Sequence, residues 1–198
     1  LQTRKFMDRK IAERQRRKEL ILKGALESYS DKGLESMTMD DIAQKSDFGK
    51  ATIYYYFSSK EDIVCALLEI GWKDLWESVE EMVVEDMSAR KKFVKILNQM
   101  ADIVYKNKSL YEFLFTAPRN ITIPDAKASW KKFQNRTYAT LQSVVDEGME
   151  QGDFADIKPD LFMKAVGGIF HGIVFMGNQK KLKEKDIESL ISNFIYPS

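Results

Sequence analysis

The chain reads MDDIAQKSDFGKATIYYYF over residues 39–57, and this stretch predicts two short helices joined by a turn. Ile42 and Ile53 fall where each helix would face a core, and Ala43 is small at the point where the two helices approach each other. Asp47 suits the turn because a short polar side chain tolerates the positive φ that is wanted there. The spacing of these residues predicts a helix-turn-helix.

The second of these helices is expected to carry an exposed face, formed by Lys50, Ala51, Thr52, Tyr54, Tyr55 and Tyr56. Three consecutive tyrosines cannot all point inward on so short a helix, so at least one hydroxyl faces solvent. A tyrosine hydroxyl and a lysine ammonium suit a phosphate or a base edge. The alternative is core packing with one exposed aromatic, because motif matches include false positives.

Helical patterns continue on both sides of this stretch. Only four prolines and ten glycines punctuate the 198 residues, and the alternation typical of strands is almost absent, which predicts an all-α fold. A first helix over about residues 8–30 is expected to end before Gly33, and Thr38 with Asp41 can cap the helix that follows. Further helices are expected at about residues 60–84, 88–107, 109–116, 124–151, 159–176 and 185–196, which makes about nine in all.

Positive charge is concentrated at the N-terminus, although the whole chain has a formal net charge of only +1. Residues 1–60 carry 13 basic and 9 acidic side chains, whereas residues 61–198 carry 18 and 21. This asymmetry indicates contact with nucleic acid or another anionic surface. A solvated helix face is one alternative. A membrane-surface helix is another, which is weakened because few large apolar residues precede Leu20.

The sequence offers little for catalysis or metal binding. Cys65 is the single cysteine and His171 the single histidine, which excludes an internal disulfide and argues against a zinc site or a Ser-His-Asp triad. No glycine-rich phosphate loop is present, so neither enzymatic activity nor a cofactor is expected. No signal-peptide core and no run of roughly 18 apolar residues occurs, so we expect a soluble cytoplasmic protein without a membrane partner.

Two stretches carry a family resemblance, namely Thr38-Met39-x-x-Ile42-Ala43 and Lys50-x-Thr52-Ile53-Tyr54-Tyr55-Tyr56-Phe57-x-x-Lys60-Glu61-Asp62-Ile63. Over about residues 8–70 the chain resembles the N-terminal domain of the TetR family of bacterial transcriptional regulators. The resemblance implies an all-α homodimer with a three-helix DNA-binding domain, residues 1–60. A long helix would join it to a helical ligand-binding and dimerisation domain, residues 61–198. Asp47, Gly49 and Tyr56 depart from the Gly, the Ser or Thr, and the His that are usual in the family.

The resemblance also implies roles for individual residues. It places Lys50, Thr52, Tyr54 and Tyr55 at the major groove of double-stranded DNA, and Tyr56 and Lys60 on the DNA backbone. Thr38 would present the N-terminus of its helix to a phosphate. The implied activity is that of a regulator, expected to be a repressor, which binds a palindromic operator as a dimer and is released by a small molecule.

The remainder of the chain is expected to hold the effector and the dimer contact. An apolar lining favours a hydrophobic or aromatic effector, and Tyr111, Trp130, Phe133 and Phe170 are candidate lining residues. Ordinary core packing is the alternative for these aromatic residues. Gly168 and Gly172 place two small residues on one helix face, which predicts the dimer interface, with chance glycines in one subunit's core as the alternative.

Overall fold

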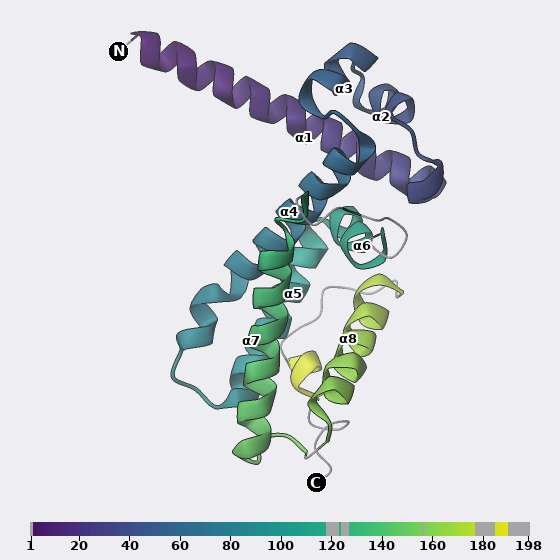
Figure 1. Cartoon of the computed structure of the whole chain (residues 1–198). Helices are drawn as coiled ribbons and strands as arrows, with labels where there is room; N and C mark the ends of the chain where they lie inside the picture. Colours follow the sequence, from purple (N-terminus) through teal and green to yellow (C-terminus); the bar gives the residue numbers. More distant parts are fainter. Residues whose placement is uncertain (1, 118–122, 124–126, 156, 177–184, 190–198) are drawn as a thin grey trace. The chain divides into compact units, whose positions relative to one another are not determined.

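Figure 1 shows the all-helical chain in the computed structural model, which describes residues 2–117, 123, 127–155, 157–176 and 185–189. Residues 185–189 form a short helical segment, and no strand occurs within these ranges. The expected all-α class is therefore confirmed. In chain order the helices are α1 (Gln2–Ser36), α2 (Met39–Ser46), α3 (Lys50–Tyr56), α4 (Lys60–Val79), the 3₁₀ helix η1 (Glu80–Val84), α5 (Ala89–Lys106), α6 (Lys108–Thr116), α7 (Lys131–Glu150) and α8 (Pro159–Phe175).

The chain divides into two compact units. The first contains Leu1–Glu69 and Ser109–Ser129, and so includes α1 to α3, the first half of α4 and nearly all of α6. The second contains Ile70–Lys108 and Trp130–Ser198, with the rest of α4, η1, α5, α7 and α8. The domain boundary at residue 60 that the sequence suggests remains a proposal about which part binds DNA and which part binds a ligand.

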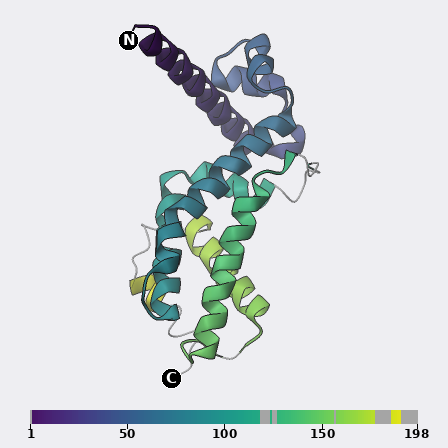
Figure 2. The same cartoon turned by 60° about the vertical axis from the view of Figure 1, so that its left-hand side comes forward.

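α1 is longer than the sequence predicts. It begins at Gln2 rather than near residue 8, and it extends to Ser36 with a break at Gly33, where φ is 73° and ψ is 169°. A backbone with positive φ favours glycine, so the expected interruption at Gly33 is confirmed. Figure 2 shows the N-terminal part of α1, in dark purple, extending past α2 and α3.

The first unit has a core in which α1, α2 and α3 meet. Ile21 and Ala25 of α1, Ile42 of α2 and Ile53 of α3 are each 0% exposed. Ile42 and Ile53, which the sequence pattern predicts to face the core, are therefore buried as predicted. Burial of a side chain of this size stabilises a fold by about 1.5–3 kcal/mol.

α6 packs against α1 in the same unit at Tyr29. The ring of Tyr29 lies edge-on to the ring of Phe113, with 5.0 Å between the ring centroids. The Tyr29 hydroxyl also shares a hydrogen bond of 2.6 Å with Thr116 Oγ1. Because 87 residues separate Tyr29 from Thr116, no local sequence pattern indicates this contact.

Gly24 lies where α1 and the end of α2 approach each other. A Cβ atom built on Gly24 would lie 2.8 Å from the backbone nitrogen of Ser46 and 2.9 Å from its Cβ. These distances are shorter than van der Waals contact, so only glycine fits without a backbone shift. The glycine thus sets how closely α1 and α2 pack.

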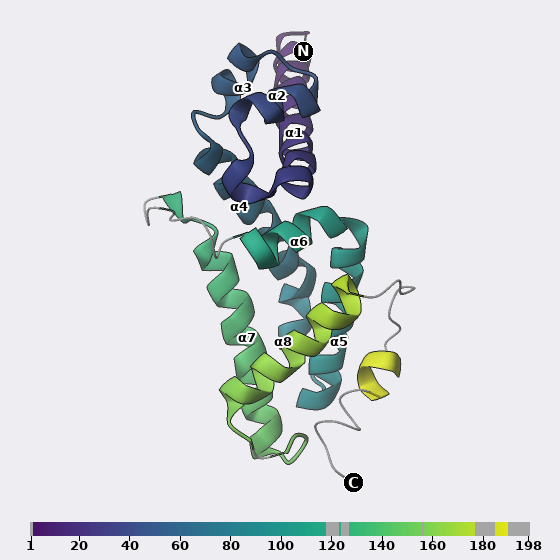
Figure 3. The same cartoon turned by 90° about the vertical axis from the view of Figure 1, so that its right-hand side faces the viewer.

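The second unit has an aromatic core among α5, α7 and α8. These three helices contact one another and are seen together in Figure 3. The ring of Phe93 lies 5.6 Å from each of the rings of Phe154 and Phe162, and those two rings lie 5.1 Å apart. Trp72, in the second half of α4, contacts Tyr138 of α7 at 5.5 Å between ring centroids. Edge-to-face and tilted pairs of this kind add about 0.5–1.5 kcal/mol beyond the area that they bury.

Three helix boundaries differ from the sequence-based expectation. The helix expected to reach residue 84 becomes a 3₁₀ helix at Glu80. The helix expected from residue 124 begins at Lys131, and residues 124–126 lie outside the described part. The last expected helix is described only over residues 185–189. The patterns of apolar residues located these helices but did not locate their ends.

Candidate nucleic-acid interface

The N-terminus of α2 is closed by a reciprocal pair of hydrogen bonds. Thr38 has extended backbone angles, and its Oγ1 accepts a hydrogen bond from the backbone N–H of Asp41 at 3.2 Å. The Thr38 backbone N–H in turn donates to Asp41 Oδ2 at 2.9 Å. This is the capping box predicted from Thr38 and Asp41, and it fixes the start of α2, the first helix of the helix-turn-helix. The predicted phosphate contact of Thr38 remains a prediction.

Asp41 makes the stability of this cap depend on pH. Hydrogen bonds from Lys32 and then from Thr38 lower the pKa of the Asp41 carboxyl from 3.8 to about 2. Because the folded-state pKa lies below the unfolded one, the carboxylate stabilises the fold above about pH 4, and this contribution is lost as the pH falls toward about 2. We expect the free energy of unfolding to fall more steeply over that range in the wild type than in Asp41→Asn, as urea titrations followed by circular dichroism would measure. Asp8→Asn, which changes an exposed carboxylate on α1, is the control and should retain the wild-type slope.

The turn between α2 and α3 has the backbone that the sequence predicts. Asp47 has φ 57° and ψ 38°, and it is the one non-glycine residue with positive φ in the described ranges. The backbone N–H of Phe48 donates to Ala43 O at 3.1 Å and closes the end of α2. Gly49 then begins α3 from an extended backbone without a side-chain cap. Aspartate therefore serves in place of the glycine that is usual at this turn.

α3 buries one side and exposes the other. Ile53 is its buried residue, whereas Tyr54 is 47% exposed and Tyr55 is 72% exposed. Tyr56 is half-buried, and its ring lies edge-on to that of Tyr55 with 5.1 Å between centroids. The expectation that at least one tyrosine faces solvent is confirmed. An exposed aromatic face with polar tips can contact bases and phosphates.

Lys50 stands at the start of this face and pairs with an acidic residue of α2. Its Nζ lies 2.8 Å from Asp40 Oδ1, and both side chains are exposed. The hydrogen bond from Lys50 to Asp40 raises the pKa of Lys50. Exposed ion pairs contribute little to stability, so a phosphate or a base acceptor can replace Asp40 at small cost.

The Lys60 ammonium group donates hydrogen bonds to backbone atoms of the same chain. Its Nζ donates to the backbone oxygens of Leu34 at 2.9 Å, Met37 at 3.2 Å and Glu35 at 3.3 Å. An ammonium group has three donors, so these three carbonyls, in the last turn of α1 and directly after it, match its capacity. The predicted DNA-backbone contact of Lys60 remains a prediction, and the observed contacts give this residue a second role in joining α1 to the start of α4.

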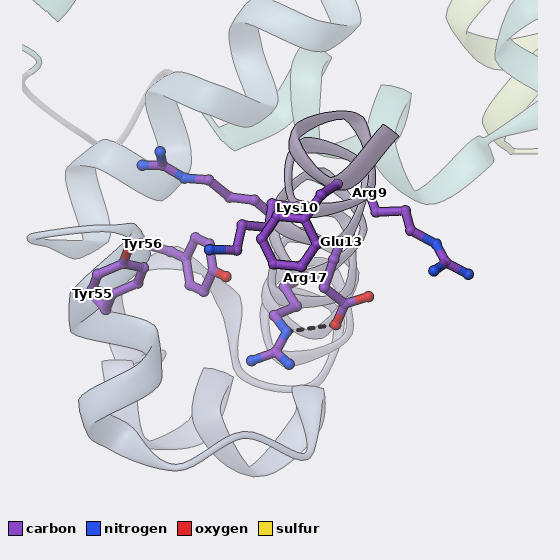
Figure 4. Close-up of a pocket in the computed structure, with 8 residues that line it drawn as sticks. Arg9, Lys10, Glu13, Arg17, Tyr55 and Tyr56 are labelled. Carbon is purple, nitrogen blue, oxygen red and sulfur yellow. Dashed lines mark hydrogen bonds and ion pairs between the residues drawn. The ribbon is translucent and has the colours of Figure 1, made fainter. Parts of the chain in front are cut away.

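A groove that the sequence did not delineate lies between α1 and the end of α3 (Figure 4). It has a volume of about 480 Å³ and is lined by Phe6, Arg9, Lys10, Glu13, Arg14, Arg17, Tyr55 and Tyr56. Arg17 Nε donates to Glu13 Oε1 at 2.8 Å, and this hydrogen bond is the largest cause of the raised pKa of Arg17, to which Tyr56 adds. The basic N-terminal residues and the tyrosines of α3 were each signals in the sequence, but nothing in the sequence indicated that they line one groove. We call this feature the α1–α3 groove.

The segment that contains the helix-turn-helix matches the model of a known family. The family model described as "Bacterial regulatory proteins, tetR family" matches residues 21–67. The chain is 25% identical over 189 residues to an uncharacterized HTH-type transcriptional regulator, YfiR of Bacillus subtilis, covering 90% of this chain and 86% of YfiR. The TetR-family regulator PfmR from Thermus thermophilus has a similar fold, with a TM-score of 0.71 at 20% identity, covering 86% of this chain and 96% of PfmR.

The chain belongs to the TetR family of bacterial transcriptional regulators. This TetR-family chain is a transcription regulator and not an enzyme. A second solved structure with the same fold is that of AibR in complex with isovaleryl coenzyme A and operator DNA, with a TM-score of 0.74 at 17% identity, covering 92% of this chain and 100% of AibR.

Neither a metal-binding cluster nor a membrane-spanning helix occurs in the part of this TetR-family chain that the structure describes. No group of three or more His, Cys, Asp or Glu side chains there could hold a metal ion. Among the helices that the structure describes, none combines the length and the apolar character that a bilayer crossing requires.

The four candidate effector-lining residues are divided between the two units of the TetR-family chain. Tyr111 is buried in α6 of the first unit, whereas Trp130 is buried in the second, where Phe133 and Phe170 are half-buried. Trp130 and Phe133 are neighbours, since the Phe133 N–H donates to Trp130 O at 3.1 Å. The Trp130 Nε1 atom is buried without a hydrogen-bond partner among the described residues. Their role in binding an effector remains a prediction.

The two glycines of α8 face open space. A Cβ atom built on Gly168 or on Gly172 meets nothing within 4 Å. In the part of the chain that the structure describes, neither glycine is therefore needed for close packing within one subunit. Chance glycines in one subunit's core remain the alternative, and the place of these two glycines in a dimer interface remains a prediction.

Proposed function

We propose that this TetR-family regulator is a repressor that binds a palindromic operator as a homodimer in the cytoplasm. Lys50, Thr52, Tyr54 and Tyr55 would contact the major groove, with Tyr56 on the DNA backbone. The observation that carries the proposal is the asymmetry of α3, which buries Ile53 and exposes two tyrosines beside Lys50. Two such helices in a dimer would enter successive major grooves about 34–36 Å apart.

α8 supplies the surface proposed for dimerisation. Leu161 is 59% exposed at its start, and Gly168 and Gly172 lie on the same face about two and three turns further on. A helix that exposes a large apolar residue along with small ones is suited to close packing against a copy of itself. Burial of this face between two subunits would also offset the cost of glycine inside a helix.

Leucine at Gly168 is expected to dissociate the dimer. A bulky side chain in a closely packed interface costs about 1–3 kcal/mol, and two-fold symmetry applies that cost twice. We expect the dimer dissociation constant of Gly168→Leu to rise at least about tenfold in sedimentation equilibrium. Gly167→Leu is the matched control, because its Cβ is equally unobstructed but points about 100° away around the helix. An unchanged dissociation constant in Gly168→Leu would contradict this assignment.

The effector is proposed to be a small hydrophobic or aromatic molecule held in the second unit. The support is the set of aromatic side chains there, including Trp130 and Phe133, together with the fold shared with AibR, which binds isovaleryl coenzyme A. An acyl-CoA combines an apolar chain with a large polar group and is the first class to test. An effector that binds the DNA-free state more tightly lowers operator affinity by the ratio of its affinities for the two states.

One experiment tests the function. Wild-type protein is used to select its operator from random double-stranded DNA, and fluorescence anisotropy then measures affinity for that operator and for a scrambled one. Acyl-CoAs of increasing chain length and aromatic acids are added to the complex. The proposal predicts sequence-dependent binding that one of these classes reverses. Binding without sequence preference would overturn it, and specific binding that no compound reverses would restrict the protein to a constitutive DNA-binding role.

A further inference from the structure

The N-terminal half of α1 lies outside the segment that the family model matches. The family model begins at residue 21, whereas α1 begins at Gln2. About five helical turns therefore precede the matched segment. Figures 1 and 2 both show this part of α1 extending past α2 and α3, and its side chains from residue 6 to residue 17 are all exposed.

The α1–α3 groove joins this extension to α3. Four basic side chains, those of Arg9, Lys10, Arg14 and Arg17, line it against a single acidic one, Glu13. Glu13 is already paired with Arg17, so the three other cations contribute uncompensated positive charge within the groove. A groove with this excess charge attracts polyanions.

Aromatic side chains form the rest of the groove, and one of them contacts a cation. Lys10 Nζ lies 4.7 Å from the centre of the Phe6 ring, a cation–π contact. Figure 4 shows Lys10 and Arg17 on the same side of α1 as Tyr55 and Tyr56 of α3. Each tyrosine adds a hydroxyl that can donate a hydrogen bond to a phosphate oxygen.

We propose that the α1–α3 groove binds the sugar–phosphate backbone of DNA beyond the base pairs that α3 contacts, an inference that rests on the proposed operator binding. Tyr55 belongs both to the groove and to the exposed face of α3. A duplex engaged by that face therefore has its backbone next to the groove. From Phe6 to Arg17 the helix extends about 17 Å, at 1.5 Å per residue, which equals the rise of about five phosphates of one strand along the duplex axis.

The lining distinguishes a phosphate backbone from a small ligand. Small-molecule sites are concave and bury most of the surface of their ligand. Here the groove is open, and its four cationic side chains are long and exposed, beside one carboxylate and three aromatic rings. Such side chains neutralise phosphates without reading bases, so DNA flanking the operator should add affinity whatever its sequence.

The test compares two double variants of the full-length protein. Lys10→Ala/Arg14→Ala removes two cations from the groove, and Arg16→Ala/Lys23→Ala removes two exposed cations of α1 that do not line it. Alanine preserves helix propensity in both cases. Each protein is titrated by anisotropy over a range of salt concentrations, against the selected operator alone and against the same operator with about ten extra base pairs on each side, roughly one helical turn.

The wild type and the control variant are expected to bind the longer DNA more tightly, irrespective of the added sequence. The groove variant should lose this gain, and its log–log salt slope per protomer should be smaller in magnitude by about 1.8, or 0.9 for each lost phosphate contact. Equal slopes for the two variants would overturn the inference while leaving the specific operator binding of the wild type intact. Absence of any specific binding by the wild type would instead show that the proposed function fails.

A vesicle experiment distinguishes DNA from a second possible anionic partner, the surface of a membrane. All three proteins are mixed with vesicles of phosphatidylserine and phosphatidylcholine and sedimented. The inference predicts unchanged, weak sedimentation for the groove variant. Vesicle binding by the wild type that only the groove variant loses, together with an unchanged DNA salt slope, would overturn the assignment to DNA.

Discussion

Replacing Lys50 and Tyr55 together by alanine is expected to weaken operator binding by about thirtyfold or more. Each side chain that contacts a base edge contributes about 1–3 kcal/mol of discrimination, so two such losses amount to about 2–6 kcal/mol. Both residues are exposed, and neither belongs to the buried core of the first unit. The variant should therefore keep the wild-type circular dichroism spectrum and melting temperature, and anisotropy with the selected operator would measure the loss.

Two further variants decide whether the loss is specific to α3. Lys73→Ala removes an exposed lysine of α4 and should leave operator affinity unchanged. Asp40→Asn removes the carboxylate that pairs with Lys50 and frees its ammonium, so it should raise affinity. An unaltered dissociation constant for Lys50→Ala/Tyr55→Ala would show that α3 does not contact the operator.

Adding one methyl group at Gly24 is expected to destabilise the first unit by about 1–3 kcal/mol. In a helix interior, alanine is favoured over glycine by about 1 kcal/mol. At Gly24 the added Cβ would lie 2.8 Å from the backbone nitrogen of Ser46 and 3.1 Å from the carbonyl carbon of Lys45. The backbone of α2 cannot rotate away as a flexible side chain can, so overpacking exceeds the gain in helix propensity. Because α3 follows α2 directly, operator affinity should fall as well.

The control for Gly24→Ala has the opposite expected sign. Gly167 is also inside a helix, but a Cβ built there meets nothing within 4 Å. Gly167→Ala should therefore stabilise the protein by up to about 1 kcal/mol. Urea unfolding followed by circular dichroism would measure both changes. A Gly24→Ala variant as stable as the wild type would show that α1 and α2 tolerate a wider separation than the structure describes.

The helix-turn-helix was determined by the sequence alone, because its signals are local. Thr38 and Asp41 cap α2 from positions three residues apart, and Asp47 adopts the left-handed backbone that its short side chain tolerates. Ile42 and Ile53 are buried because helical periodicity turns them to one side. The cap, the turn and the direction in which the two isoleucines point depend only on nearby residues, and the family resemblance rests on the same stretch.

The tertiary structure alone decided how residues distant in the chain meet. Lys60 bonds to Leu34 across 26 positions, and Tyr29 reaches Thr116 across 87. The α1–α3 groove likewise brings together Arg14 and Tyr55, although these residues lie on different helices and no helical periodicity relates their positions. Periodicity gives the direction of a side chain around its own helix but not the position of the neighbouring helix. That position depends on packing, and in this protein a single glycine, Gly24, sets the distance between the first two helices.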